Sequence, residues 1–252
     1  MPKILVIEDN EEFRNAAEQY FVSRDDVEPI FAKDFDEAVQ ILDTEKDTLD
    51  GAIVDFFFPK STGSGDVQIG RELVERLIEE DSKELNARDL YEEFRKYLDF
   101  SNEENALFAK KAAIYYANSI PPGGVSEMLM VKVLKKTYDL VGGKVASLIF
   151  KNAHPNVDQI KDHYGALERG LAESEYNQPL GLIIGEQLMV ESLPFVFATS
   201  TYHHASTGQK IHDYANRNIG VPIIECGQDK ENEKATTLFW EKAYTAFEST
   251  LK

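Results

Sequence analysis

A short apolar run near residue 50 ends abruptly in a carboxylate, and this pattern organises the N-terminal part of the chain. Residues 51–54 form the run, Asp55 follows it, and three aromatic residues and Pro59 come next. A continuous apolar run bounded by glycine and proline predicts a strand buried on both faces. Asp55 would then stand at the carboxyl end of the strand, where open α/β sheets place their chemistry. A buried aspartate there needs a cation, hydrogen bonds or a proton.

The first 60 residues alternate between strand-like and helix-like segments. Strands are predicted at 4–7 and 27–32, and the proline in the second favours an edge position. One helix is predicted between these strands, and Asp34 is positioned to cap another over 35–42. Two strands and two helices ahead of the run at 51–54 predict the start of a parallel, right-handed α/β sheet.

The same alternation returns after residue 180. The sequence predicts a helix over 181–193, a buried strand over 194–200, a helical stretch over 208–217, a short strand over 221–224 and an amphipathic helix over 233–251. Together the two ends of the chain predict an α/β domain with a doubly wound, five-stranded parallel sheet, built from residues 1–60 and 180–252.

Residues 61–179 have a different character and predict an α-helical subdomain inserted into a surface loop of the α/β domain. Helical periodicity is present at 71–80, 87–98, 104–118, 125–140 and 157–173. Insertion at a loop is tolerable because closure entropy grows slowly with loop length. Either Gly70 or Gly181 can open the third helix of the sheet domain, and we favour Gly181 because that segment leads directly into the next strand.

The apolar stretches of this insertion, such as 128–134 and 145–150, have two interpretations. They form the core of the subdomain, which is the simpler one, or they form a helical interface for a protein partner.

The composition narrows the function classes. A net charge of −18 argues against a nucleic-acid surface, which needs a basic footprint, and against an anionic membrane surface. It attracts cations to any acidic cleft. Cys226 is the only cysteine, so no internal disulfide can form. The N-terminus lacks a signal-peptide pattern and no stretch approaches ~18 uninterrupted apolar residues, so we expect a soluble cytoplasmic protein.

Three carboxylates are expected to converge at one edge of the sheet. Glu8 and Asp9 follow the first strand and Asp55 follows its expected neighbour. These groups repel one another unless a hard cation lies between them, and Mg²⁺ suits oxygen ligands with water and a phosphate in the remaining positions. Thr199, at the end of the next strand, can donate a hydrogen bond to a phosphoryl oxygen. The set predicts phosphoryl transfer to a carboxylate.

At these motifs the sequence resembles the receiver domain of bacterial and archaeal response regulators. The first strand with its acidic pair, the Asp-Phe-Phe-Phe-Pro segment at 55–59 and the strand ending in Thr199 are similar to three family motifs in the family's order. The resemblance covers 1–60 and 180–252. It implies that Glu8, Asp9, Asp55 and the Phe57 carbonyl bind Mg²⁺, that Asp55 is the phosphoacceptor and that Thr199 contacts the phosphoryl group. It also implies a two-component phosphorelay, with a histidine kinase or another phosphodonor as partner.

Two positions depart from the family pattern. The family has a lysine at the end of its fifth strand, where this chain has Glu225 followed by Cys226. A carboxylate there would remove the ammonium expected to pair with the phosphoryl group. The aromatic switch position corresponds to Pro222. Lys60 and Lys230 are considered as substitutes for the missing lysine.

Three further features have open interpretations. The Gly/Ser-rich loop at 61–66 cradles a phosphate or gates the site, or it is a flexible connector, which is the commoner case. His203 and His204 bind a transition metal or act as acid and base, or they point to solvent as adjacent histidines in a loop commonly do. Cys226 is a reactive thiol or, as is more usual for a lone cysteine near a strand end, a small buried residue that only packs in the core.

Three functions from different classes follow. The first is a phosphorylatable receiver-like signalling protein with the helical insertion as its output or partner-binding module. The second is a pseudo-receiver scaffold that is not phosphorylated, which Glu225 favours. The third is a Mg²⁺-dependent phosphatase or phosphotransferase with Asp55 as nucleophile. Phe57 stands where the haloacid-dehalogenase phosphatases have a second aspartate, which disfavours the third.

Overall fold

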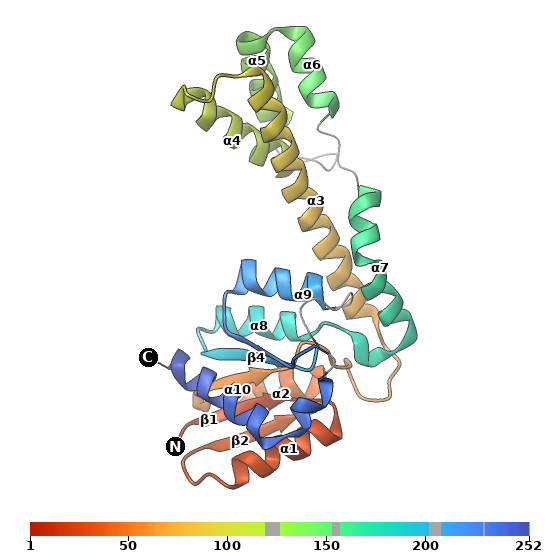
Figure 1. Ribbon diagram of the computed structural model, residues 1–252, viewed down its shortest axis with the longest axis vertical. Helices are drawn as coiled ribbons and strands as arrows, with labels where there is room; N and C mark the ends of the chain where they lie inside the picture. The colour runs from red at the N-terminus through yellow and green to blue at the C-terminus, as the bar shows by residue number, and fades with distance from the viewer. Residues whose placement is uncertain (119–126, 153–156, 202–207, 229, 252) are drawn as a thin grey trace. The chain divides into compact units, whose positions relative to one another are not determined.

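The computed structural model describes residues 1–118, 127–152, 157–201, 208–228 and 230–251. The chain divides into two compact units, Met1–Glu75 with His163–Lys252, and Arg76–Asp162. The first unit contains the sheet, and the described residues of the second are helices and their connections (Figure 1). The domain limits expected from the sequence, 1–60 with 180–252 around 61–179, stay a prediction.

Five parallel strands form a single sheet, as the sequence predicted, and their order is β2-β1-β3-β4-β5. The strands are β1 (Lys3–Ile7), β2 (Glu28–Ala32), β3 (Gly51–Val54), β4 (Phe195–Thr199) and β5 (Ile223–Glu225). β3 and β4 are buried along their whole length because they lie inside the sheet with helices on both faces. β2 lies at the edge of the sheet. Pro29 has no backbone N–H to donate, and an edge strand tolerates this because only one of its sides pairs with another strand.

Helices cover both faces of the sheet, as the doubly wound prediction requires. The helices that lie entirely within this unit are α1 (Glu11–Val22), α2 (Phe35–Glu45), α8 (Gly181–Val190), α9 (Gln209–Tyr214) and α10 (Thr237–Thr250). α1 and α10 pack on one face, and α2 and α8 pack on the other (Figure 1). Asn10 and Asp34 cap α1 and α2 with their side-chain oxygens, which satisfies backbone amides that each first turn leaves unpaired.

The apolar positions of the strands alternate between the two faces. Ile4, Val6 and Ile53 point to the α1 and α10 side, where they join a fully buried aromatic set from these helices. That set includes Phe21, Trp240, Tyr244 and Phe247. Burial of each such side chain stabilises the fold by roughly 1.5–3 kcal/mol, so this core fixes the carboxyl ends of β1 and β3 where the acidic residues emerge.

The helices outside the sheet pattern differ from expectation in two places. They are α3 (Gln68–Tyr97), α4 (Glu103–Asn118), α5 (Glu127–Val141), α6 (Gly143–Asn152) and α7 (Val157–Glu173). The separate helices predicted at 71–80 and 87–98 are one continuous helix, because the polar residues between them include no glycine or proline. α6 was anticipated only as an apolar stretch. Within Arg76–Asp162, Leu90 and Phe94 of α3 share a buried cluster with alanines of α4 and with Ile149 of α6.

Four short turns complete the described elements. They are η1 (Lys46–Thr48), η2 (Glu175–Asn177), the π-helical η3 (Ala215–Ile219) and η4 (Glu231–Ala235). The third helix of the sheet unit is α8, which begins at Gly181 and leads into β4, as the sequence favoured.

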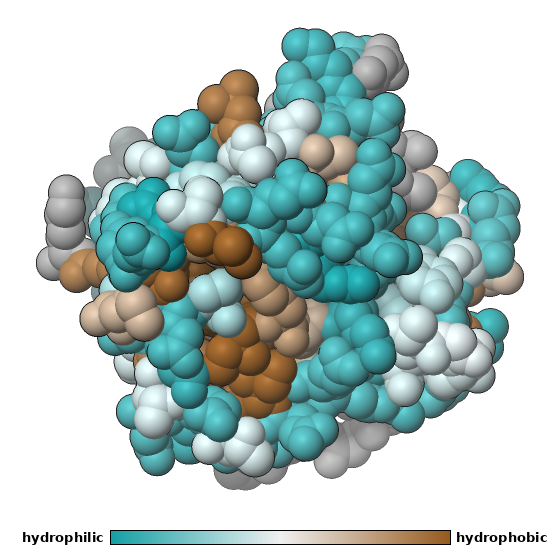
Figure 2. All heavy atoms as spheres, turned by 90° about the horizontal axis from the view of Figure 1, so that it is seen from below, coloured by the Kyte–Doolittle hydropathy of each residue, from teal (hydrophilic) through white to brown (hydrophobic). Residues whose placement is uncertain are grey.

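The surface is largely polar. Figure 2 shows a mostly hydrophilic face with a hydrophobic patch near its middle, which fits a chain with 45 acidic residues. In the part of the chain that the structure describes, each helix falls short of the length or the apolar character that a membrane span requires.

Candidate functional site

Glu8, Asp9 and Asp55 come together at the carboxyl ends of two neighbouring strands. The Asp55 backbone amide donates to the Ile7 carbonyl at 3.2 Å, which continues the β1–β3 ladder by one residue beyond β3. One carboxylate oxygen from each acidic residue lies within 4.8 Å of the other two. Glu8 is fully buried and Asp55 is 6% exposed. The parallel sheet therefore concentrates three acidic groups in a space that excludes most water.

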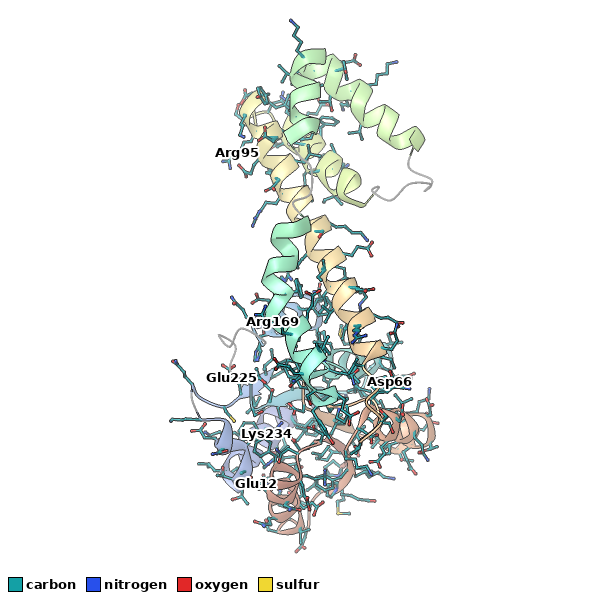
Figure 3. The ribbon with its side chains drawn as sticks, turned by 90° about the vertical axis from the view of Figure 1, so that its right-hand side faces the viewer. Glu12, Asp66, Arg95, Arg169, Glu225 and Lys234 are labelled. Carbon is teal, nitrogen blue, oxygen red and sulfur yellow. The ribbon has the colours of Figure 1, made fainter. Side chains whose placement is uncertain are left out.

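Lys234 is the cation of this cluster, and sequence reasoning missed it. Its ammonium Nζ lies 2.6 Å from Glu8 Oε2 and 3.0 Å from Asp55 Oδ2, and its side chain is fully buried. The expectation that Glu225 removes the positive charge from this site is therefore wrong. The charge comes from a turn after β5 rather than from the end of that strand (Figure 3).

A local break in the C-terminal helix places Lys234. The sequence predicted one helix over 233–251, but the chain forms η4 (Glu231–Ala235) and begins α10 only after the Thr236 cap. The buried indole of Trp240 donates from Nε1 to the Lys234 carbonyl at 2.9 Å. This bond holds the backbone of the turn, which packs against α1, and the lysine side chain extends from there to the carboxylates.

Burial and mutual repulsion change the acidity of the cluster. Burial, opposed by Lys234 and reinforced by Asp55 and Asp9, raises the pKa of Glu8 to about 8. Burial together with the Asp55 charge raises the pKa of Asp9 to about 7. Burial alone would lower the pKa of Lys234, but its attraction to Asp55 and Glu8 outweighs burial and raises it. Three carboxyl groups facing one ammonium favour the uptake of a further positive charge, either a proton or a metal ion.

The remaining hydrogen bonds orient the two inner carboxylates. Asp55 Oδ1 accepts from the Phe56 amide at 2.8 Å, and Glu8 Oε1 accepts from the Asn10 amide at 3.1 Å. Each carboxylate thus uses one oxygen for the backbone and turns the other toward Lys234. The side chains are fixed before any ligand arrives, which is the preorganisation that a binding site requires.

The other predicted site residues lie close by in different settings. Thr199 is fully buried, and its hydroxyl accepts from the Thr201 amide at 3.1 Å. Phe57 lines the cavity described below. Their predicted roles, phosphoryl contact and carbonyl ligand, stay predictions. Glu225 pairs in register with Thr199, and its carboxylate lies 3.8 Å from Nδ1 of the buried His212.

The two lysines considered as substitutes are engaged elsewhere. Lys60 Nζ lies 2.9 Å from Asp66, and Lys230 Nζ lies 3.4 Å from Glu233. Both pairs are near the surface. Neither lysine is the cation paired with Glu8 and Asp55, which is Lys234.

The Gly/Ser-rich loop at 61–66 is tied to the fold by carboxylates. Glu175 accepts from the Gly63 amide at 2.7 Å and also from the Gly65 amide. Gly63 and Gly65 have φ angles of +78° and +68°, a conformation that glycine adopts without strain. Thr62 donates from its amide to Asp34 at 3.0 Å. The loop is therefore held at several points, and two of its backbone amides already bind the Glu175 carboxylate.

The acidic cluster opens into a cavity of about 430 Å³. Its lining comes from the strand ends, from the start of α1, and from the C-terminal part of α7 with η2. Ser200 and Thr201, beyond the end of β4, contribute hydroxyl groups. The predicted residues His203 and His204 lie outside the described residues.

Comparisons with protein families, with curated proteins and with solved structures found no match to this chain. Carboxylate oxygens are the ligands that hard divalent cations prefer, and the spacing of these three allows one ion to contact all of them. An ammonium 3.0 Å from a carboxylate, as Lys234 is from Asp55, is also an arrangement that can stabilise charge on a product formed at that carboxylate.

Proposed function

We propose that this chain is a receiver-like signalling protein that accepts a phosphoryl group on Asp55 in the presence of Mg²⁺. The helical segment at 61–179 would serve as its output or partner-binding module. A histidine kinase or another phosphodonor would supply the phosphoryl group. The observation that carries the proposal is the buried contact of Lys234 with both Asp55 and Glu8, at the carboxyl edge of a parallel sheet of order β2-β1-β3-β4-β5.

The donor set fits a magnesium ion. Glu8, Asp9 and Asp55 would hold it, with the Phe57 carbonyl as a further ligand, and the ion would neutralise charge on the incoming phosphoryl group. The fit is supported by the geometry, because one carboxylate oxygen from each of the three residues lies within 4.8 Å of the other two.

The residues of the chain supply the remaining chemistry. One carboxylate oxygen of Asp55 attacks phosphorus and forms a P–O bond, while the bond between phosphorus and the donor breaks and the leaving group departs with its electron pair. Lys234 lies within reach of the new acyl phosphate, and its ammonium can move from the carboxylate to a phosphoryl oxygen. Thr199, or the cavity-lining hydroxyls of Ser200 and Thr201, would contact the same group.

A second candidate, the unphosphorylated pseudo-receiver scaffold, is favoured by one specific feature. The ammonium of Lys234 already compensates Asp55 and Glu8 in a dry ion-pair network. Such a network can hold the strand ends together without a metal or a phosphoryl group. The choice between the two functions therefore depends on whether Asp55 reacts.

The deciding experiment uses acetyl phosphate and beryllium fluoride. Wild type and Asp55→Asn are incubated with each reagent and Mg²⁺, then compared by intact mass and by the fluorescence of Trp240. Trp240 is a suitable reporter because its buried ring lies 5.8 Å from Lys234 Nζ. We expect a Mg²⁺-dependent gain of one phosphoryl group and a fluorescence change in wild type alone. Absence of both would leave the scaffold function. Turnover of a phosphate ester that Asp55→Asn abolishes would indicate a phosphatase instead.

A further inference from the structure

The cavity beside the acidic cluster has two chemically different walls. The strand ends supply the carboxylates of Glu8, Asp9 and Asp55, and the end of α7 with η2 supplies Arg169 and Asn177. Every lining residue belongs to the sheet-containing unit, whose second segment begins at His163. The cavity is therefore a feature of one unit, and its size of about 430 Å³ falls in the range of small-molecule sites.

Arg169 is a cation without an internal partner in the described part of the chain. Its exposed side chain lines the cavity from α7 (Figure 3). It makes no hydrogen bond or ion pair with a described residue. By contrast, Arg24 has a bidentate contact with Asp26, and Arg14 donates to the Glu8 carbonyl. A guanidinium group without a partner has several N–H donors in one plane, and two of them can bind two phosphate oxygens at once.

The wall that carries Arg169 is fixed to the sheet unit. Gln178 is fully buried and donates from Nε2 to the Asp66 carbonyl at 2.8 Å, while its Oε1 accepts from the Gly70 amide. The Phe58 amide donates to the Gln178 carbonyl at 3.1 Å. Asn177 donates to the Gly170 carbonyl at 2.9 Å, which ties η2 to α7. Arg169 therefore has a defined position relative to the segment that follows Asp55.

The charges of the cavity determine what it can hold. Four carboxylates line it, those of Glu8, Asp9, Asp55 and Glu173, and a bare anion would be repelled by them. An anion that arrives with a divalent cation meets ligands for the cation on one wall and Arg169 on the other. Aromatic rings of Phe13, Phe57 and Tyr176 supply apolar surface for the rest of a ligand.

We propose that this cavity binds a small phosphorylated molecule as its divalent-cation complex, with Arg169 contacting the phosphate. A molecule of this kind would be the phosphodonor of Asp55, in place of a phosphohistidine carried on a folded protein domain. Asp55 is 6% exposed and is reached through a lined cavity, which suits a small ligand better than a protein surface. The assignment of the ligand as donor rests on the proposed function, whereas the binding site itself does not.

The test uses two probes, inorganic phosphate and phenyl phosphate, titrated calorimetrically into wild type, Arg169→Gln, Arg169→Lys and Arg95→Gln with Mg²⁺ present. Arg95 is an exposed arginine of α3 paired with Glu92 and serves as the matched control. We expect phenyl phosphate to bind more tightly than inorganic phosphate. We expect Arg169→Gln to weaken binding by about tenfold or more, as for the loss of a charge-assisted contact, and Arg169→Lys to weaken it less. Arg95→Gln should bind as wild type does.

Three other outcomes overturn the inference, and a fourth overturns only the proposed function. Equal affinities for wild type and Arg169→Gln would remove Arg169 from the site. Binding of inorganic phosphate alone would show an ion site without room for a substituent. Absence of binding by both probes, with Asp55 phosphorylated only by a phosphohistidine domain, would make the donor a protein. Phenyl phosphate binding through Arg169, with no gain of a phosphoryl group on Asp55 from acetyl phosphate or from a phosphohistidine domain, would refute the proposed function and leave the ligand site standing.

Discussion

The ammonium of Lys234 lies 3.0 Å from the Asp55 carboxylate, although the two residues belong to opposite ends of the chain. The same ammonium lies 2.6 Å from Glu8. Both contacts are almost free of solvent. A lysine in this position compensates part of the buried negative charge in the unmodified protein, and under the proposed function the same ammonium would contact the phosphoryl group.

Removal of the Lys234 charge should destabilise the protein. In Lys234→Met the carboxylates of Glu8 and Asp55 remain buried without their cation, and breaking a buried ion pair in this way costs about 3–5 kcal/mol. The free energy of unfolding in urea measures the loss. Lys230→Met, an exposed lysine next to the same turn, should change stability by less than ~0.5 kcal/mol. A similar small effect for both variants would show that Lys234 does not compensate the buried carboxylates.

Gly181→Ala should displace Asp55. A Cβ atom at Gly181 would lie 2.0 Å from the Asp55 carbonyl oxygen and 2.8 Å from the Phe56 Cα, and both are backbone atoms that cannot rotate away. We expect a loss of at least ~2 kcal/mol in stability and a weaker Trp240 response to beryllium fluoride. In Gly170→Ala of α7 the new methyl group meets Asn177 only at 3.6 Å, so this control should be neutral or stabilising. A Gly181→Ala protein with wild-type stability would contradict the close approach.

Glu175→Gln should loosen the loop at 61–66. The variant keeps the shape of the side chain but loses the charge that binds the Gly63 and Gly65 amides, and we expect a destabilisation of about 1–2 kcal/mol. Hydrogen exchange of these two amides, followed by NMR, should accelerate. Glu173→Gln, an exposed neighbour in α7, should leave their exchange unchanged. Protection that persists in Glu175→Gln would mean that another group holds the loop.

Cys226 should be unreactive in the folded protein. It is fully buried, and burial raises the pKa of its thiol to about 11 although the Lys234 amide and charge act in the opposite direction. Below that pKa the protonated thiol predominates, so at pH 8 only about a thousandth of it is the nucleophilic thiolate. Alkylation with iodoacetamide at pH 8 should be at least ~100-fold slower in native than in denaturant-unfolded protein. Comparable rates would show an accessible, activated thiol.

Local sequence patterns determined much of the fold. The apolar runs at 4–7 and 51–54, each followed at once by acidic residues, specified two buried parallel strands and put Glu8, Asp9 and Asp55 at one sheet edge. Asp34 was predicted as a cap because its side chain acts on its own helix turn. Such features depend on neighbours in sequence, so the sequence displays them. The predicted break between 80 and 87 was wrong because polar residues alone do not end a helix.

Only the tertiary structure decided where the positive charges of the site come from. Lys234 lies in a segment with helical periodicity, and the η4 turn that redirects it depends on the packing of Trp240 against the sheet. Arg169 reaches the cavity because Gln178 and Glu175 fasten the end of α7 and η2 to segments more than 100 residues away. Sequence spacing carries no trace of such contacts. The sequence by itself determined the acidic half of the site, and the packing of distant elements determined the basic half.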